Sequence, residues 1–336
     1  MLKSLLKLIV AIMFAIALPS LAVANEGSIR PLTSVAKGAQ VVSVGFYPLN
    51  VYGVDPANST FTYDGYIWFR WNGEIDPTKS VEFTNAVDRS SLSKEFLFET
   101  PQVAPDGAKY QIMRVESAFL KPFSLSSFPL DQHDLSIVLE DSLNGVDRLV
   151  YDIDKSDTSY APGLSISGWT LNDWSHERTI VDYSSRFGDR SVTQASQYAR
   201  ISFSMNISRP GSYFIWKLLL PLVVVICGAW IALLLNPVLT ETRAALPASA
   251  LLTTVFLQQS YTSTLPETGG LVLLDEIYVV AYVLIVATLA RVIIKSHNIE
   301  EKSEAEVRAL RRQDIRSLVI QVVIFCAASA ALVLSR

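Results

Sequence analysis

Residues 243–266 constrain the fold of this chain more than any other stretch. The segment is long enough to cross a bilayer as a helix, which takes about 20 residues. One face of that helix, however, carries small and polar side chains at helical spacing. This stripe consists of Glu241, Ala245, Ser249, Leu252, Phe256, Gln259 and Ser263. A membrane helix with such a face needs either partner helices or water beside it.

The composition indicates a protein that is half exposed to water and half embedded in lipid. Of the 336 residues, 50% are hydrophobic and 18% are charged. The formal net charge of -4 argues against nucleic acid as a partner. The two cysteines, Cys227 and Cys326, lie in apolar runs, so we expect no disulfide framework, no metal site and no cofactor.

Residues 1–24 have the pattern of a secretory signal peptide. Lys3 and Lys7 precede a short apolar run, and the small residues 22–24 form a cleavage site after Ala24. An N-terminal membrane anchor is the alternative, but the apolar run is short for a span. We therefore expect the segment that follows to be exported.

Residues 25–208 predict a β-sandwich. The segment is rich in turn residues and contains short runs of alternating polar and apolar residues with many Val, Ile, Tyr and Phe. These runs are 40–46, 63–71, 111–119, 135–139, 149–153 and 196–205. We expect about ten antiparallel strands in an immunoglobulin-like sandwich.

Residues 209–336 predict a four-helix transmembrane domain, so the fold class is α+β. The candidate spans are 212–235, 244–264, 271–294 and 318–334. Basic residues gather in the linker 295–317 and are missing from 265–270, which places the linker in the cytoplasm and residues 25–208 outside. The linker also carries nearly as many acidic residues, among them Asp314, so we expect a solvated, partly helical connector; a lipid-binding basic patch is the alternative.

The hexapeptide 128–133, Phe-Pro-Leu-Asp-Gln-His, resembles the signature loop of the pentameric ligand-gated ion channels, the Cys-loop receptor superfamily. The pattern of that loop is Phe-Pro-x-Asp-x-Gln, and His133 stands in place of the Gln. The cysteines of the animal receptors would fall at Lys121 and Leu135, so the chain resembles the prokaryotic branch that lacks them.

Further matches follow in the order of the family and cover about residues 38–334. They are the turn 55–58, Trp71 as a core tryptophan, Phe83-Thr84-Asn85 as the first ligand-binding loop, Gly168-Trp169, Arg209-Pro210 before the membrane, Pro221 in the first span and Leu265-Pro266 after the second.

The resemblance implies a homopentamer in which the stripe lines a pore. Glu241 would form a ring of carboxylates that selects cations at the cytoplasmic mouth. Leu252 and Phe256 would form apolar rings that gate the pore by dewetting, with Gln259 and Ser263 in the outer vestibule. A helix–helix interface is the alternative for this stripe.

Two residues near the start of the second span qualify this assignment. Arg243 would snorkel to the inner surface or pair with Glu241, and facing the axis it would oppose cation selectivity. Pro247 is tolerated only in a first helical turn, so we expect the regular pore helix to start there.

The resemblance also implies a coupling site and a ligand site. Arg209 would pair with Asp131 or Asp55 and transmit motion towards Leu265 and Pro266; a static salt bridge is the alternative. The agonist would bind between subunits. One side would contribute Tyr66, Trp68 and Arg70, and the other Phe83, Asn85, the loop 141–147 and the hairpin 183–193 with Tyr183, Arg186 and Phe187. Aromatic side chains suit an amine or an aromatic acid, and protons are a further candidate agonist.

The sequence thus predicts a channel for monovalent cations in the lipid of the bacterial inner membrane, with its N-terminal domain in the periplasm. The alternative is a non-conducting exported sensor that relays a signal through its four helices. No nucleophile–base pair, phosphate loop or metal spacing is visible, so we expect no catalytic residues.

Overall fold

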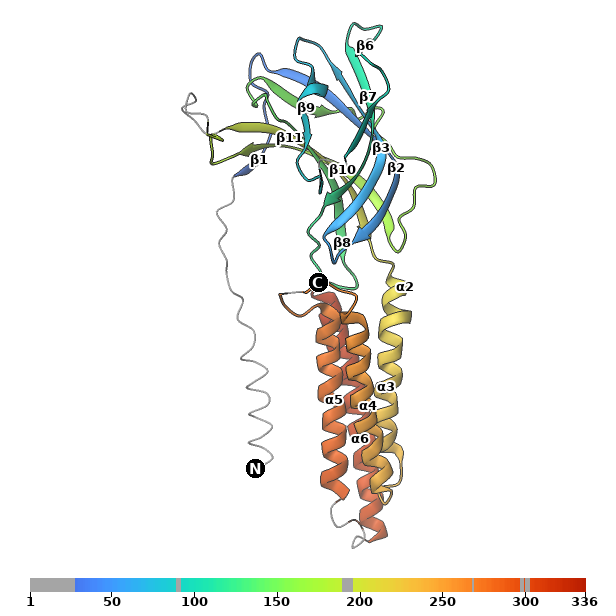
Figure 1. The fold of residues 1–336 in the computed structure, drawn as a ribbon. Coiled ribbons are helices and arrows are strands. Elements are labelled where there is room, and N and C mark those ends of the chain that lie inside the picture. Colours follow the sequence, from blue (N-terminus) through green and yellow to red (C-terminus); the bar gives the residue numbers. More distant parts are fainter. Residues whose placement is uncertain (1–27, 89–91, 189–195, 268, 297–298, 300–302) are drawn as a thin grey trace.

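The protein has a β-sandwich at one end and a bundle of helices at the other (Figure 1). The computed structural model describes residues 28–88, 92–188, 196–267, 269–296, 299 and 303–336. The predicted signal peptide, 1–24, lies outside the described residues. The C-terminus lies at the end of the bundle that faces the sandwich (Figure 1).

The sandwich contains eleven strands within the described residues. They are β1 (Ile29–Pro31), β2 (Gln40–Asp55), β3 (Thr60–Trp71), β4 (Val81–Phe83), β5 (Ser93–Phe96), β6 (Gln102–Val103), β7 (Lys109–Leu120), β8 (Gln132–Asp141), β9 (Leu149–Ile153), β10 (Thr170–Asp182) and β11 (Gln197–Ser208). One sheet has the order β1-β10-β11-β8-β4 and the other β5-β7-β3-β2-β9, with β6 on β7. All pairs are antiparallel except β2 with β9, which is parallel.

Alternating residues build the core between the two sheets. Along β3, Ile67, Phe69 and Trp71 are almost completely buried and face the other sheet. Phe46 of β2 stacks on Phe203 of β11 with ring centroids 4.8 Å apart, so the two sheets meet through aromatic contact. The alternation read from the sequence is therefore the alternation of buried and outward-facing side chains.

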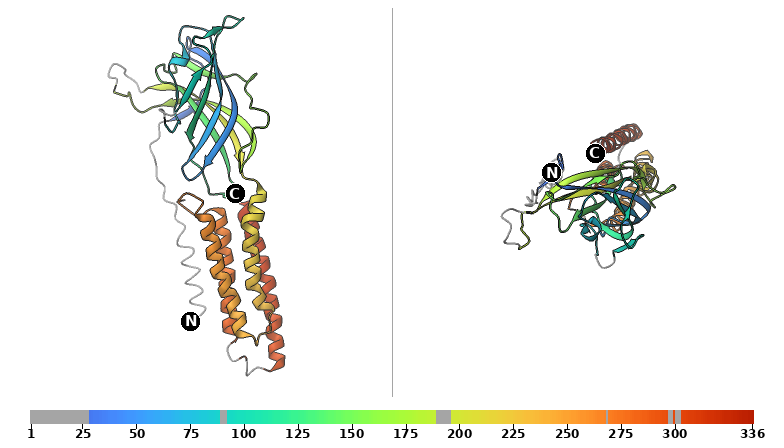
Figure 2. Two further views of the ribbon diagram at one scale, coloured as in Figure 1. Left: turned by 45° about the vertical axis from the view of Figure 1, so that its right-hand side comes forward. Right: turned by 90° about the horizontal axis from the view of Figure 1, so that it is seen from above.

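The helices run side by side below the sandwich (Figures 1 and 2). They are α2 (Gly211–Tyr213), a π-helical turn (Phe214–Leu219), α3 (Leu220–Leu234), α4 (Thr240–Thr262), α5 (Leu273–Ser296) and α6 (Glu304–Leu334). Three helical stretches in the described chain are long and apolar enough to cross a membrane: Gly211–Leu234, Leu273–Ser296 and Glu304–Leu334. The helix α4 is not among them.

The prediction that the second helix starts at Pro247 is wrong. The helix begins at Thr240 and continues through the proline. Pro247 removes one backbone donor, but a side-chain contact with a neighbouring helix stabilises the helical turns before it. Arg243 donates from its side chain to the carbonyl of Ala232 on α3, at 2.7 Å, and its backbone N–H reaches Leu239 at 3.0 Å.

A π-helical turn precedes Pro221. The N–H of Leu220 donates to the carbonyl of Ile215, five residues earlier. Pro221 has no N–H to continue the regular α-helical ladder, and a π-turn shifts the pairing locally.

The final helix starts earlier than the predicted span 318–334. A reciprocal pair of hydrogen bonds between Ser303 and Glu306 forms a capping box, which starts α6 within the predicted linker 295–317. Asp314 is buried inside the bundle, with a side chain only 2% exposed. It therefore does not balance the basic residues of the linker, contrary to the prediction.

Candidate functional site

The stripe predicted on the second helix lies on an exposed face of α4. Its members are all exposed: Glu241, Ala245, Ser249, Leu252, Phe256, Gln259 and Ser263. Leu252 is 59% exposed and Phe256 64% exposed, although both are large and apolar. The opposite face of α4 is buried against the bundle through Pro247, Ala250 and Thr254, among others. Within one chain, the stripe is therefore not a contact between helices.

Polar groups on the buried side of α4 are satisfied within the bundle. The amide of Gln258 donates to Asp275 of α5 at 3.0 Å and accepts from Tyr282 at 2.7 Å, and the hydroxyl of Tyr261 also donates to Asp275. The polarity of Gln258 is thus explained by helix packing. The neighbouring Gln259 faces outward.

Arg243 lies inside a buried ionic cluster and not on the exposed stripe. Its side chain is 1% exposed and its Nη2 lies 2.5 Å from Asp314 Oδ2. Arg291 of α5 binds the other oxygen of Asp314 at 2.8 Å. Together with the bond to Ala232, this cluster joins α3, α4, α5 and α6. Arg243 therefore pairs with Asp314, and the predicted pairing with Glu241 is not present among the described contacts.

Arg209 anchors the last strand of the sandwich to the signature loop. Its Nε lies 2.8 Å from Asp131 Oδ1, and its guanidinium carbon lies 4.2 Å from the ring centre of Trp169 and 5.0 Å from that of Phe128. Burial alone would raise the pKa of Asp131, but the hydrogen bond from His133 and the charge of Arg209 lower it overall. The ion pair is consequently present at neutral pH.

The signature loop also docks on the helical bundle. The carbonyls of Ser126 and Phe128 accept the backbone N–H groups of Leu273 and Leu274 at 2.9 and 3.2 Å. These donors belong to the first turn of α5, where the backbone N–H groups have no acceptor within the helix itself. The ring of Phe128 stacks on Tyr261 of α4 with centroids 6.3 Å apart. The loop thus contacts two helices of the bundle.

Asp55 does not join this cluster, which corrects the prediction that it shares Arg209. Its carboxylate accepts from the backbone of Ala57 and Asn58 and from the Asn58 side chain, within its own turn. These bonds lower the pKa of Asp55. A short polar side chain at the start of a turn bonds its own backbone more readily than a distant group.

The turn after β2 nevertheless lies near the α4–α5 connection. Pro56 and Ser59 line a pocket of about 370 Å³ together with Phe123, Leu125 and Pro266. Leu265 is half-buried and packs against the cluster of the helical bundle. The predicted coupling residues Leu265 and Pro266 therefore lie where the sandwich meets the helices.

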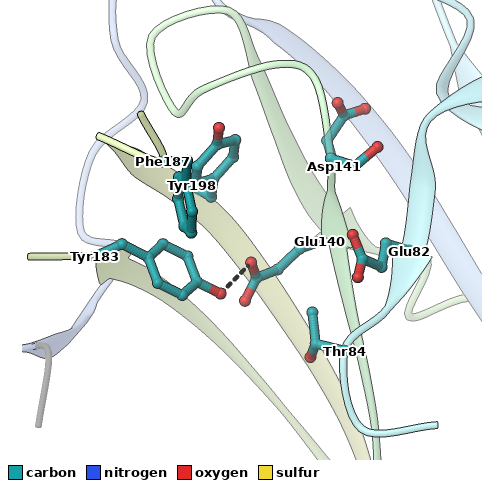
Figure 3. Close-up of a pocket in the computed structure, with 8 residues that line it drawn as sticks. Glu82, Thr84, Glu140, Asp141, Tyr183, Phe187 and Tyr198 are labelled. Carbon is teal, nitrogen blue, oxygen red and sulfur yellow. Dashed lines mark hydrogen bonds between the residues drawn. The ribbon is translucent and has the colours of Figure 1, made fainter. Parts of the chain in front are cut away.

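A second pocket, of about 430 Å³, lies on the sandwich between the end of β8 and the loop after β10 (Figure 3). It is lined by Glu82, Thr84, Glu140, Asp141, Ser142, Tyr183, Phe187 and Tyr198. Figure 3 shows aromatic rings on one side of the pocket and carboxylates on the other.

Glu140 is the centre of the hydrogen bonds in this pocket. It accepts from the hydroxyl of Tyr183 at 2.8 Å and from Arg200 Nε at 2.5 Å. Burial, followed by the bond to Glu140, raises the pKa of Tyr183, which is thus a neutral donor. Phe187 extends the aromatic wall, with its ring 5.3 Å from that of Tyr183. Its φ of 50° is rare for a bulky residue and places its ring, 64% exposed, at the rim.

The predicted ligand residues divide into three groups. Tyr183 and Phe187 line the pocket, and Arg186 is exposed on the same loop. The rest of the hairpin, 189–193, lies outside the described residues. Tyr66, Trp68 and Arg70 lie together on the outward face of β3, in the other sheet. These last three do not line the pocket at Glu140.

Two of these β3 side chains, Trp68 and Arg70, are held in position by polar contacts. The indole of Trp68 donates to Asp154 at 3.0 Å and covers Gly45, where a Cβ would lie 2.0 Å from its ring. Arg70 binds Asp106 at 2.5 Å.

Phe83 and Asn85 are structural residues, and their assignment to the ligand site is corrected. Phe83 is 2% exposed and packs in the core of the sandwich. The amide of Asn85 donates to the carbonyls of Leu120 and Ser136 and accepts from Val138, so it ties β7 to β8. Between these two residues, Thr84 reaches the pocket.

Sequence reasoning missed Glu82, Glu140 and Tyr198 as pocket residues. Glu140 lies opposite Arg200 in the pairing of β8 with β11, and opposite Glu82 in the pairing of β8 with β4. That juxtaposition depends on the order of strands in the sheet. A single strand carries no signal for it.

Comparison with known proteins identifies relatives among channels. The chain is 23% identical over 243 residues to a gamma-aminobutyric acid receptor subunit beta of Caenorhabditis elegans, which covers 66% of this chain and 41% of that protein. It is 18% identical over 303 residues to a proton-gated ion channel of Gloeobacter violaceus, covering 86% of this chain and 82% of that protein. A gamma-aminobutyric acid receptor subunit beta-like protein of Drosophila melanogaster is 23% identical over 189 residues, or 55% of this chain and 35% of that protein. No family model matches the chain.

The chain is related to the Cys-loop receptor superfamily. It spans less than half the length of the gamma-aminobutyric acid receptor relatives that it matches. The sandwich followed by a helical bundle, three of whose helices are apolar enough to span a membrane, agrees with this relationship and identifies an integral membrane protein. Within this Cys-loop receptor homologue, Arg209 pairs with Asp131 of the loop 128–133, one of the two pairings that the resemblance implied.

Proposed function

We propose that this protein is the subunit of a homopentameric, ligand-gated channel for monovalent cations. The observation that carries the proposal is the polarity of α4. The helix α4 runs beside three helical stretches that are apolar enough to span a membrane. It is not one of them, and it exposes a stripe of small, polar and apolar side chains. If several copies of the chain were arranged about a common axis, this stripe would face a water-filled pore instead of lipid.

The exposed stripe supports a gated pore. Leu252 and Phe256 would form consecutive apolar rings, and a narrow apolar constriction closes by dewetting. Ala245 and Ser249 lie on the side of Glu241, while Gln259 and Ser263 lie on the side of the sandwich. The pore would thus be polar at both ends and apolar between them.

The charges around α4 support selection of cations. Glu241 is exposed at the start of the stripe, where a ring of carboxylates attracts cations and repels anions. Arg243 is buried and bound to Asp314, so its positive charge does not oppose the ring. The charge that α4 contributes to the pore at this end would therefore be negative.

The pocket at Glu140 supports a small agonist that carries a positive charge. Its aromatic wall of Tyr183, Tyr198 and Phe187 faces carboxylates, which is the combination that binds an amine through cation–π and ionic contacts. The outward face of β3, with Tyr66 and Trp68, would complete the site from the neighbouring subunit. Two relatives are named for gamma-aminobutyric acid and protons. Protons therefore remain a second candidate agonist.

The basic residues of α6 support an orientation with the sandwich in the periplasm of a bacterial inner membrane. Arg308, Arg311, Arg312 and Arg316 are exposed near the start of this helix, at the end of the bundle away from the sandwich. Basic residues collect on the cytoplasmic side of spans.

Purified protein in planar bilayers tests the proposal. We expect unitary currents in the wild type, and a Leu252→Thr variant with a larger open fraction because a polar ring holds water in the constriction. In a salt gradient, Glu241→Gln should shift the reversal potential towards that of a non-selective pore. Glu304→Gln, an equal change of charge at an exposed site on α6, is the matched control.

Absence of unitary currents from all variants would overturn the channel proposal. An unchanged reversal potential in Glu241→Gln would overturn the assignment of the selectivity ring alone, because conduction would persist.

A further inference from the structure

His133 lies at the junction between the sandwich and the helices. It contacts the carboxylate of Asp131, which also forms an ion pair with Arg209. Its side chain is 2% exposed, and its Nε2 lies 2.7 Å from Asp131 Oδ2. The other oxygen of Asp131 binds Arg209 Nε at 2.8 Å. Arg209 is followed directly by α2 and the first span. A single carboxylate therefore holds both a titratable ring and the arginine that leads into the membrane.

The other ring and strand neighbours of His133 within the described residues are uncharged. Its ring meets the edges of Phe123 and Trp169, with centroids 4.9 and 5.5 Å apart, and on β11 it pairs with Ile207. The next residue on β8, Asp134, points to the other face of the sheet and accepts from Asn206 at 3.0 Å. The charged groups that face His133 are thus Asp131 directly and Arg209 through the shared carboxylate.

We propose that His133 is a regulatory proton site, and that the proton it binds weakens the Asp131–Arg209 link. A neutral imidazole donates one hydrogen bond to the carboxylate. An imidazolium adds a full positive charge to that bond and so places a second cation beside Arg209. Asp131 then divides its charge between two cations that repel each other.

The consequence for gating rests on the proposed channel function. Arg209 also stacks on Trp169 and Phe128, and the loop that carries Phe128 caps the first turn of α5. A weaker hold on Arg209 therefore loosens the contact through which the sandwich acts on the helices. Acid would therefore reduce opening through this site, which is opposite to the effect of protons that act as an agonist.

Tryptophan fluorescence tests proton binding without any current. A protonated imidazole quenches an indole in contact with it, and Trp169 is such a reporter for His133. His176 lies against Trp174, with ring centroids 6.0 Å apart, so the titration is carried out in a His176→Gln background. We expect the fluorescence to fall as the pH is lowered from about 8 to about 5. The quenching should disappear in His133→Gln/His176→Gln, and also when Trp169→Phe is added to His176→Gln.

Currents in planar bilayers test the effect on the link, with pH steps on the sandwich side as the only stimulus. The open probability of the His176→Gln channel should fall about tenfold on acidification if the proton bound at His133 favours the closed state by about 1.4 kcal/mol. His133→Gln keeps an amide donor for Asp131 and should leave the open probability independent of pH over the same range.

The outcomes separate the two proposals. Equal quenching with and without His133 would overturn the proton site. A titrating His133 combined with currents that ignore pH would overturn its effect on the link. Absence of currents under all conditions would overturn the channel function, while the fluorescence titration would still decide whether His133 binds a proton.

Discussion

Substitution of Asp314 should destabilise the helical bundle more than most other substitutions, although Asp314 is not part of the exposed stripe. Its carboxylate is 2% exposed and binds Arg243 at 2.5 Å and Arg291 at 2.8 Å. The change Asp314→Asn keeps the shape of the side chain and removes its charge. Two arginines then remain with no counter-ion between them.

The size of the effect follows from the burial of the two arginines. Arg291 is 23% exposed at its side chain and can turn part of its charge towards water, whereas Arg243 is 1% exposed and cannot. Removing one partner of a buried ion pair costs about 3–5 kcal/mol. We therefore expect a loss of about 3–5 kcal/mol in the free energy of unfolding, most of it from Arg243. At about 2.1 cal/mol/K of unfolding entropy per residue, the 336 residues give about 0.7 kcal/mol/K, so this loss lowers Tm by about 4–7 °C.

Thermal unfolding of the detergent-solubilised protein measures this loss. Arg308→Gln is the matched control, because Arg308 forms an exposed ion pair with Glu304 at 3.8 Å on the same helix. Exposed pairs of this kind contribute little to stability, so the control should unfold close to the wild-type temperature. Replacing Arg243, Arg291 and Asp314 together with leucine should recover most of the loss, since no buried charge then remains.

An unchanged Tm in Asp314→Asn would refute this reasoning. A triple leucine variant that is less stable than Asp314→Asn would refute it as well, because the penalty would then come from lost packing or lost hydrogen bonds and not from unpaired charge.

Three further predictions concern the sandwich. Phe83→Ala should lower the stability by about 3–5 kcal/mol, as expected for a buried aromatic side chain; a near-wild-type Tm would return Phe83 to the candidate ligand residues. Asn85→Ala should cost about 1–3 kcal/mol, because three backbone groups lose their partner, and equilibrium denaturation measures it. The pKa of Asp131 is lowered in the folded state, so its stabilising effect is complete above its ordinary pKa of about 4 and is lost as the pH falls below that value. The Tm of Asp131→Asn should therefore fall less steeply below pH 4 than that of the wild type, and parallel curves would contradict the assigned ion pair.

The sandwich and the apolar helices could be predicted because their signals are local. Alternation along β3 places Phe69 and Trp71 in the core without reference to any other strand. Likewise, an apolar run of span length can satisfy its backbone in lipid only as a helix. The polarity of the second helix belongs to the same class of signal, since it depends only on spacing within one segment.

The start of α4 and the burial of Asp314 could not be read in this way. Both involve the contact of Arg243 with Asp314, which lie 71 residues apart, whereas the start of α6 is marked locally by the capping box of Ser303 and Glu306. Pro247 alone predicts a helix start, and the mixed charges of 295–317 alone predict a solvated connector. Tertiary contacts outweigh both local signals, because burying Arg243 requires a carboxylate at that place.

The ligand pocket shows the same limit for strands. Tyr183 and Phe187 were accessible before the structure because the resemblance to the family implies a ligand-binding hairpin at 183–193. Glu140 was not, because its neighbours on β4 and β11 are brought beside it by the order of the sheet.

The amino-acid sequence by itself determined where strands and helices form and which face of the second helix is polar, since periodicity is a property of consecutive residues. Only the tertiary structure decided which charges are paired, at Asp131, Arg209, Arg243 and Asp314, and which of two neighbouring residues, such as Phe83 and Thr84, serves the core or the pocket. The physical reason is that pairing and burial depend on groups far apart in the chain, and the free energy of a buried charge is set by whichever partner the fold brings to it.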